Sequence, residues 1–305
     1  MNMFEVVGIG ANVCDTLISV DSYPIEDTKK RVETVIRSGG GPCATGLCAA
    51  SRLGAECAYI GTFTDDAAGK FLVEDMERYG VSTEVSCIEA GYTSFTSYIL
   101  ISAETASRTC VFHKGDVPEC ALTKEQVGAI ENAKILLIDG NNIAVAREAV
   151  KIARESGTTV LYDAGGRYDG IEALLTYTDI LIPSEEFALS ITGEESTDAA
   201  AKMLYEKYSP RVVLITEGKK GGVIYDGVSV KRYPAFKVDA KDSNGAGDVF
   251  HGAYAYAMTR GMDYYTAAVF SSAVSAIKCK KIGARAAVPE YDEVIKFLKE
   301  NGYEL

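Results

Sequence analysis

The segment 241–250, with the sequence KDSNGAGDVF, combines small residues with a carboxylate. Gly245, Ala246 and Gly247 leave their backbone N–H groups uncovered, and an apolar pattern typical of a helix begins at the same point. A helix N-terminus with bare amides carries partial positive charge and unpaired donors, so it is a binding site for an anion. Asp248 falls in the first turn, where it is either a carboxylate that matches the helix dipole or a base beside the anion. The spacing alone leaves both interpretations open.

The elements that must position this segment alternate between strand-like apolar runs and helical faces. Strands are predicted at 4–9, 57–62, 135–138, 159–162, 179–182 and 212–216. Helices are predicted at 42–53, 68–79, 123–132, 245–260, 264–278 and 291–300, and a hairpin is predicted to turn at Asp226 and Gly227. This spacing indicates β-α-β units and a mostly parallel sheet that is covered on both faces. We therefore expect residues 1–305 to form a single α/β domain with three α/β/α layers.

Two regions, 14–37 and 92–114, do not fit this alternation. Residues 95–102 and 108–113 are strand-like and are joined by a turn near Glu104, which is typical of a hairpin. Residues 17–36 are also strand-like, and they are polar. Together these pieces predict a small β-sheet lid that stands apart from the main domain. The exposed edges of such a sheet need cover, so we expect the lids of two chains to pair in a homodimer.

The composition narrows the possible partners. Hydrophobic residues make up 47% of the chain and charged residues 24%, which is typical of a globular protein with a large core. A formal net charge of −12 argues against binding to nucleic acid or to an anionic membrane, although a local cluster of donors can still hold a phosphate. No apolar run approaches the ~20 residues of a membrane span, and no signal peptide opens the chain, so we expect a cytoplasmic protein.

Several other kinds of site are disfavoured by the residues at hand. The eight cysteines contain no Cys-x-x-Cys pair, and the two histidines, His113 and His251, offer few parts for a zinc site or a histidine-based triad. The run from Gly8 to Gly10 lacks the third glycine of a dinucleotide-binding fingerprint. The Walker pattern of P-loop kinases is also missing from the sequence.

The sequence Asp-Ser-Asn-Gly-Ala-Gly-Asp at 242–248 resembles the second signature of the ribokinase, or PfkB-type, carbohydrate kinase family. Further landmarks follow the order of that family over nearly the whole chain. They are Asp15 after the first strand, the di-glycine run at 38–44, the segments 182–186 and 189–193, and the glycine-rich segment 214–222. Five matches in the family's order argue against chance.

The resemblance implies an ATP-dependent kinase that phosphorylates a hydroxyl of a sugar or sugar-like molecule. The backbone amides of residues 245–248 would form the anion hole for the γ-phosphoryl group, and Asp248 would take the proton of the attacking hydroxyl. This division of labour is sufficient because phosphoryl transfer depends mainly on positioning and electrostatic stabilisation. ATP is the expected phosphoryl donor, and Mg²⁺ is the expected metal.

On the substrate side, the resemblance implies contacts from the lid and from the ends of strands. These residues are Asp15, Gly40, Gly41, Thr45, Asp139 and Arg108. Thr45 stands where the family usually has Asn, which leaves the sugar unnamed. Arg108 lies in a run that resembles ketohexokinase-like members, and Asp139 falls where those enzymes carry an acidic sugar contact. An ordinary solvated turn is an equal alternative for the segment that begins at Asp139.

On the nucleotide side, the resemblance implies contacts from the ends of two later strands. These residues are Ser184, Thr216, Gly218 and Gly221. Ser184 departs from the family's usual Asn. Glu186 would hold Mg²⁺ through water, and Asp242 with the backbone near Gly283 would bind a monovalent cation such as K⁺.

The substrate and even the activity have alternatives at this point. Aldoses, ketoses and sugar acids all remain open. One alternative is a nucleoside kinase of the same fold, and another is a sugar-binding sensor without turnover. Retention of both the 245–247 glycine-rich run and Asp248 argues against the sensor, because a binder has no need of the base.

Overall fold

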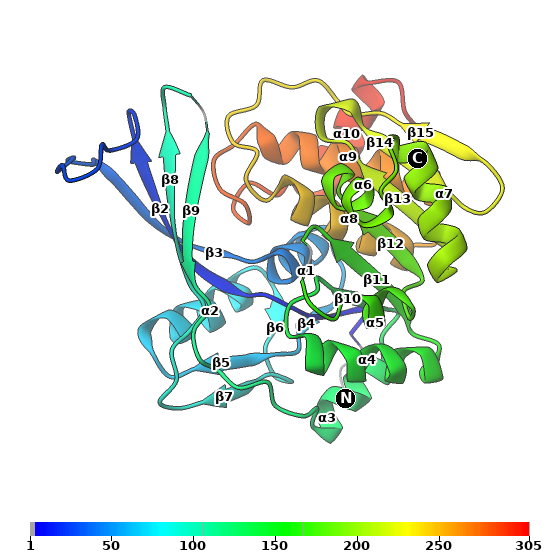
Figure 1. The fold of residues 1–305 in the computed structure, drawn as a ribbon, viewed down its shortest axis with the longest axis horizontal. Helices are drawn as coiled ribbons and strands as arrows, with labels where there is room; N and C mark the ends of the chain where they lie inside the picture. The colour runs from blue at the N-terminus through cyan, green and yellow to red at the C-terminus, as the bar shows by residue number, and fades with distance from the viewer. Residues whose placement is uncertain (1–3, 106, 167, 305) are drawn as a thin grey trace.

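The computed structural model describes residues 4–105, 107–166 and 168–304. Within these residues, nine strands form a central sheet, which contains all six predicted strands (Figure 1). In spatial order the strands are β15 (Val230–Tyr233), β14 (Gly222–Tyr225), β13 (Val212–Thr216), β12 (Ile180–Pro183), β11 (Thr159–Ala164), β10 (Ile135–Ile138), β1 (Val6–Ile9), β4 (Cys57–Tyr59) and β6 (Val81–Ser82). All neighbours pair in parallel except the β13–β14 and β14–β15 pairs. The prediction of a mostly parallel sheet is confirmed.

Helices cover both faces of this sheet, so the three predicted layers are also confirmed. One face packs on α1 (Pro42–Arg52), α2 (Ala67–Arg78), α8 (Ala246–Thr259), α9 (Tyr264–Cys279) and α10 (Tyr291–Glu300). The other packs on α3 (Lys124–Asn132), α4 (Ile143–Ser156), α5 (Glu172–Leu175), α6 (Glu185–Thr192) and α7 (Thr197–Tyr208). Successive strand residues such as Leu136 and Leu137 enter opposite cores, as the strand period of two requires. Across the described residues, no helix combines the length and the apolar character that crossing a membrane would require.

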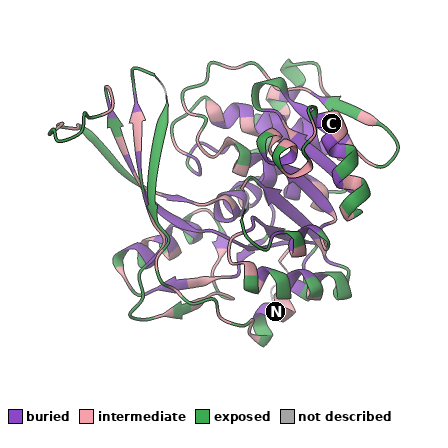
Figure 2. Ribbon diagram, viewed as in Figure 1, coloured by how far each residue is buried: buried purple, intermediate pink, exposed green. Residues whose placement is uncertain are grey.

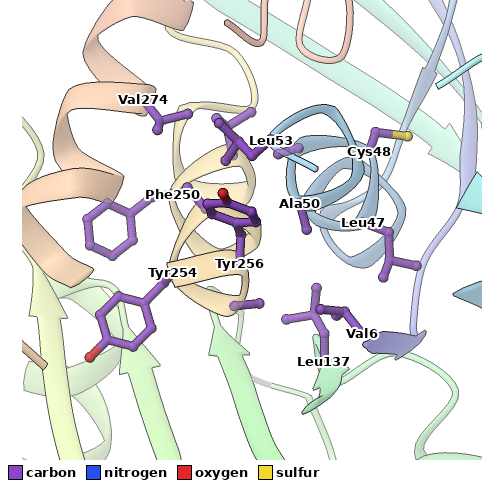
Figure 3. Packing of buried hydrophobic residues seen from close by; sticks show 14 of the residues in the cluster. Val6, Leu47, Cys48, Ala50, Leu53, Leu137, Phe250, Tyr254, Tyr256 and Val274 are labelled. Carbon is purple, nitrogen blue, oxygen red and sulfur yellow. The ribbon is translucent and has the colours of Figure 1, made fainter. Parts of the chain in front are cut away.

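Helices α1 and α8 lie in contact over the strands, and this contact places the two glycine-rich signatures side by side. Figure 3 shows Leu47 and Ala50 of α1 facing the same core as Phe250 and Tyr254 of α8. The two helices approach so closely that a Cβ atom on Gly252 would overlap the carbonyl oxygen of Gly46. The start of α8 is therefore fixed relative to the start of α1.

A second sheet projects from the main body as the predicted lid. Its strands are β3 (Thr34–Gly40), β2 (Val13–Val20), β8 (Thr96–Ser102) and β9 (Arg108–His113), in that order (Figure 1). Strands β8 and β9 form the expected antiparallel hairpin, whereas the run at 17–36 divides into parts of β2 and β3 joined by a loop. All six residues of β9 are exposed, and much of the lid is exposed or half-buried in Figure 2. The structure also contains a two-stranded parallel sheet of β5 (Thr62–Thr64) and β7 (Cys87–Glu89), which the sequence did not predict.

Several residues of the candidate site lie at the carboxyl ends of the parallel strands, along one edge of the central sheet. Gly10 follows β1, Asp139 follows β10, Asp163 lies near the end of β11, Ser184 follows β12, and Thr216 ends β13. The chain leaves β1 toward the lid and β4 on one side, while β10 pairs with β1 on the other. Ligands of open α/β sheets bind outside the strand ends at such a reversal of strand order.

Candidate active site

The N-terminus of α8 is built from the glycine-rich segment. Gly245 is its N-cap with φ +73°, a left-handed conformation that glycine adopts without strain, and the helix proper begins at Ala246. The Val249 amide donates to the Gly245 carbonyl at 2.9 Å, and the Ala246 amide donates to Ser243 at 3.2 Å. Among the described residues, none accepts from the amides of Gly247 and Asp248. The Gly247 and Asp248 amides are thus available to an anion, whereas the Ala246 amide, which was expected in the same anion hole, is engaged by Ser243.

The Asp248 carboxyl lies in the first turn of α8 and is half-buried. Burial and the negative charge of nearby Asp163 raise the pKa of Asp248 to about 7, against smaller opposing effects of His251 and Arg108. A carboxyl with a pKa near neutrality is suited to act as a general base. The sequence alone could not separate this role from a simple match to the helix dipole, because the raised pKa comes from residues distant in the chain.

His251 holds the first turn of α8 against the sheet, although its position in the sequence suggested an ordinary helix residue. Its Nδ1 lies 2.7 Å from the Gly247 carbonyl oxygen and 3.1 Å from Asp163 Oδ2, and its Nε2 lies 3.0 Å from the Ile182 carbonyl oxygen. Burial lowers the pKa of His251 and raises that of Asp163 well above its usual range. The ring therefore ties the peptide between Gly247 and Asp248 to the ends of β11 and β12.

On the substrate side, Asp15 and Gly40 lie together. Asp15 is buried on β2, and its Oδ1 accepts a hydrogen bond from the Ser97 hydroxyl of β8 at 2.6 Å. A Cβ atom on Gly40 would overlap Asp15 Oδ2, so only glycine leaves room for this carboxyl. Burial raises the pKa of Asp15, and the Ser97 hydrogen bond and the charge of Arg285 oppose this effect.

Arg108 connects the lid to the segment before α8. Its guanidinium donates from Nη1 to Asn244 Oδ1. Its charge also opposes, as a small effect, the rise in the pKa of both Asp15 and Asp248. The predicted substrate residue Arg108 is thus brought to the same site as Asp15 and Asp248.

Asp139 and Thr45 have structural surroundings that their sequence positions did not reveal. Asp139 Oδ2 accepts from the amides of Ala11 at 2.8 Å and Cys43 at 3.0 Å, and Oδ1 accepts from the Asn141 amide at 2.9 Å and its side chain at 3.2 Å. Both carboxylate oxygens are therefore engaged by the protein. Thr45 is completely buried in α1, and its hydroxyl has no hydrogen-bond partner among the described residues. The Asp139 carboxylate is occupied by the protein and the Thr45 hydroxyl is enclosed in the core, and the expected direct substrate contacts of both residues stay predictions.

A cavity of about 330 Å³ lies beside this cluster. Its lining includes Gly10, Asn12, Ser94, Lys114 and Asn141, which come from the ends of β1 and β10 and from the chain around the lid. The sequence interpretation assigned no contact to Ser94 or Lys114 of this lining. Gly41 joins this region to α1: a Cβ atom there would overlap the carbonyl of Ala11, which adjoins the cavity.

A larger cavity of about 690 Å³ opens at the N-terminus of α8. Three of the predicted nucleotide-side residues line it, together with two residues of the anion hole. These five are Thr216, Gly218, Gly221, Ala246 and Gly247. The segment 233–240 and the α9 residues Ser272, Ser275, Ala276 and Cys279 also contribute to the lining, and the sequence interpretation missed them. Ser184 is outside this lining; its hydroxyl accepts from the Phe187 amide at 3.1 Å and caps α6.

The residues present fit a magnesium ion that is held mainly by phosphates and water. Glu186 is exposed in the first turn of α6, whereas Glu185 pairs with Lys220 at 3.3 Å. Within the described residues there is no group of three His, Cys, Asp or Glu side chains that could hold a metal ion by themselves. Mg²⁺ commonly binds through one or two carboxylates plus substrate phosphates, so such a cage is not required.

The residues around Asp242 do not fit the predicted potassium site. The carbonyl oxygen of Asp242, and that of Asn244 two residues later, both accept hydrogen bonds from Lys278 Nζ and are therefore occupied. Asp242 Oδ2 accepts from the Gly283 amide at 2.8 Å and lies 3.8 Å from Lys278 Nζ. The sequence correctly placed Asp242 beside Gly283, but it did not indicate that Lys278 lies between the carbonyl oxygens.

A buried arginine supports the substrate-side turn from below. Arg285 is 1% exposed, and its Nη1 donates to Asp75 Oδ2 at 2.6 Å. Its Nη2 donates to Asn12 Oδ1 at 2.9 Å and to the carbonyl oxygen of Gly40. The sequence interpretation missed this residue, because an arginine in a polar loop usually points into solvent.

Comparison with known proteins agrees with this geometry. A model of the pfkB family carbohydrate kinases matches residues 3–291, and the chain belongs to that family. It is 28% identical to an ATP-dependent ribose-1-phosphate kinase of Halopiger xanaduensis over 98% of this chain and 99% of the relative. It is also 28% identical to a 5-dehydro-2-deoxygluconokinase of Shouchella clausii over 97% of this chain and 96% of the relative. The expected class, an ATP-dependent carbohydrate kinase, is confirmed.

Solved structures confirm the fold. A ribokinase from Arabidopsis thaliana, complexed with ribose and ATP, superposes with a TM-score of 0.88 at 22% identity, over 98% of this chain and 99% of that one. A protein from E. coli, solved in complex with ATP and Mg²⁺, superposes with a TM-score of 0.85 at 19% identity, over 97% and 99% of the two chains. At these identities the likeness shows the shared ribokinase fold.

The buried Arg285–Asp75 pair generates a prediction about stability. Replacing Arg285 by Met leaves Asp75 buried without its partner, so we expect a loss of about 3–5 kcal/mol in the free energy of unfolding, measured by urea titration. The control is Lys281→Met, which removes an exposed partner of Glu293 and should cost less than about 1 kcal/mol. Equal effects of the two substitutions would contradict the account of Arg285.

Proposed function

We propose that this carbohydrate kinase transfers the γ-phosphoryl group of ATP to a hydroxyl of a sugar or sugar-like molecule at the N-terminus of α8. The observation that carries the proposal is the pairing of free amides at Gly247 and Asp248 with a carboxyl whose pKa is raised to about 7. Gly247 lines the cavity of about 690 Å³, and Asp248 follows it directly in the first turn of the helix. A site for an anion and a base beside it are the two parts that the transfer requires.

In the proposed reaction, Asp248 accepts the proton of the substrate hydroxyl as its oxygen attacks the γ-phosphorus. The bond from that phosphorus to the β–γ bridging oxygen breaks, and ADP leaves. The amides of Gly247 and Asp248 hold the negative charge of the migrating group, and they need no reorganisation because Gly245 and His251 already fix the first turn of α8. Mg²⁺ would neutralise charge on the nucleotide phosphates, with Glu186 as a contact through water.

The nucleotide would occupy the 690 Å³ cavity, which Thr216, Gly218 and Gly221 line. The E. coli neighbour solved with ATP and Mg²⁺ and the Arabidopsis ribokinase solved with ATP support this use of the fold. Ser184 would act at one remove, because its hydroxyl caps α6 and its backbone bridges to Thr216.

The substrate would lie against Asp15, the Gly40–Gly41 turn and Arg108, under the lid. Asp15 offers a hydrogen-bond acceptor, and Arg108 offers a cation that contacts Asn244, just before the start of α8. Asp139 would act indirectly by fixing the start of α1, and Thr45 by packing that helix into the core. The two curated relatives are named for ribose 1-phosphate and 5-dehydro-2-deoxygluconate, so sugar phosphates and sugar acids belong in any screen beside free sugars.

The Asp248 assignment predicts a specific loss of turnover. Release of ADP, followed with a coupled assay over sugars, sugar phosphates, sugar acids, polyols and nucleosides, should identify an accepted substrate for the wild type. Asp248→Asn should then lower turnover by roughly 10²-fold or more, as expected for a lost base, while nucleotide binding is retained. Asp292→Asn, in the first turn of α10, is the matched control and should keep full activity.

The pH dependence of kcat/KM tests the same assignment. The raised pKa keeps Asp248 protonated, and unable to accept a proton, below about pH 7. Activity of the wild type should therefore rise as the pH increases through about 7, and the residual activity of Asp248→Asn should lack that step.

A nucleoside as the accepted substrate in the screen would favour the nucleoside kinase alternative. The absence of any turnover over the whole panel would favour the sensor.

We also propose that two chains pair through their lids. Thr16 pairs with Arg37 and Tyr98, and Tyr98 pairs with Val111, so these side chains share the lid face opposite Asp15. On this face Tyr98 is 49% exposed and Val111 is 57% exposed. Large apolar side chains on an open sheet need cover.

Lid pairing predicts a dimer that a charge on the lid face abolishes. Light scattering at micromolar concentration should give twice the chain mass for the wild type and a single chain mass for Val111→Glu. Val228→Glu is the control, because Val228 is 87% exposed but lies in the turn between β14 and β15. A monomeric wild type, or a dimer that survives Val111→Glu, would contradict pairing through the lid.

A further inference from the structure

A lysine side chain lies buried beside the segment that precedes α8. Lys278, in the last turn of α9, has no exposed surface. Its Nζ donates to the carbonyl oxygen of Asp242 at 2.9 Å and to that of Asn244, and it lies 3.8 Å from Asp242 Oδ2. Lysine is almost never fully buried unless it is paired, so the partners of Lys278 must explain its burial.

The partners of Lys278 Nζ identify it as an ammonium group. All of them are oxygen acceptors: two backbone carbonyls and one carboxylate. An ammonium has three donors and no acceptor, so it satisfies both carbonyls, and its charge is attracted by the nearby carboxylate of Asp242. Burial lowers the pKa of Lys278, and the negative charge of Asp242 opposes that effect. The set of acceptors favours the charged form.

The ammonium fixes the backbone from which the anion hole starts. Since the C=O and N–H of a trans peptide point in opposite directions, holding the Asn244 carbonyl on Lys278 turns the Gly245 amide away from it. Asp242 completes the arrangement, because its Oδ1 accepts from the Asn244 amide at 2.8 Å and its Oδ2 from the Gly283 amide at 2.8 Å. The side chain of Asn244 in turn accepts from Arg108 of the lid.

We propose that the Lys278 ammonium performs the task of a bound monovalent cation in this chain, so that the kinase needs no added K⁺. The oxygens that would bind the ion converge on Nζ, and a second cation at the same place would be repelled by it. Lys278 thus acts as a positioning residue for the 242–245 segment. The inference rests on the proposed function of the 245–248 amides.

The first test uses the wild type alone. Turnover with ATP, Mg²⁺ and an accepted substrate is measured in buffers whose monovalent cation is choline, sodium or potassium at equal ionic strength. Equal kcat in the three buffers is the expected result. Activation by potassium over choline would overturn the proposal, and this arm requires no variant to fold.

The second test removes the charge in two ways. Lys278→Ala opens space among the carbonyl oxygens, and Lys278→Met fills much of that space without a charge. We expect both to lose about tenfold or more in kcat in choline buffer, as for lost electrostatic preorganisation, and only Lys278→Ala to regain activity with K⁺ or NH₄⁺. Lys281→Met, which changes an exposed lysine in the same region, should keep wild-type kcat in every buffer. Full activity of Lys278→Ala in choline, or a loss that neither cation repairs, would overturn the proposal.

A third readout does not depend on turnover. The melting temperature in the presence of ADP should rise with added K⁺ for Lys278→Ala and should not respond to K⁺ for the wild type. A wild type that is stabilised by K⁺, or a Lys278→Ala variant that is not, would count against the internal cation. If the wild type phosphorylates nothing, the proposed function fails, but this comparison still decides whether Lys278 replaces the ion.

Discussion

The two free N–H groups at the start of α8 are the feature on which the rest of the site depends. An unpaired backbone donor is costly unless water or a ligand satisfies it, so a fold that keeps two of them open must hold them rigidly. Gly245 supplies the left-handed turn, and His251 holds the Gly247 carbonyl, so the amides point away from their own helix. The close contact of Gly46 with Gly252 then fixes α8 against the first glycine-rich signature.

The two sides of the site are joined by a short chain of polar contacts. Arg108 of the lid donates to Asn244, and the Asn244 carbonyl accepts from the buried Lys278. Arg285, which lies in the loop after α9, donates to the carbonyl oxygen of Gly40 beside Asp15. The end of α9 and the segment that follows it therefore contact both the backbone before α8 and the turn at Gly40. Asn244 therefore contacts both Arg108 of the lid and Lys278, which holds the backbone before α8.

Much of the architecture could be predicted from the sequence because the apolar periods are long and regular. The runs at 135–138 and 212–216 became strands β10 and β13 with the predicted bounds, and the glycine-rich segment gave the start of α8. The three-residue strands β5 and β7 are too short to carry a period. The burial of Asp139 and Thr45 was not evident from the sequence, because it depends on the packing of α1. The roles of Lys278 and Arg285 were not predicted, because their partners lie far away in the chain. Asp75, for example, is 210 residues from Arg285.

The most direct measurement of the central claim is a crystal structure with ADP, aluminium fluoride, Mg²⁺ and the accepted substrate, a mimic of the group in transfer. The account predicts the fluoride ligands within about 2.7–3.2 Å of the Gly247 and Asp248 amide nitrogens, at hydrogen-bond distance. It also predicts the Asp248 carboxylate in contact with the acceptor oxygen. A fluoroaluminate bound elsewhere, with those amides facing only water, would contradict it.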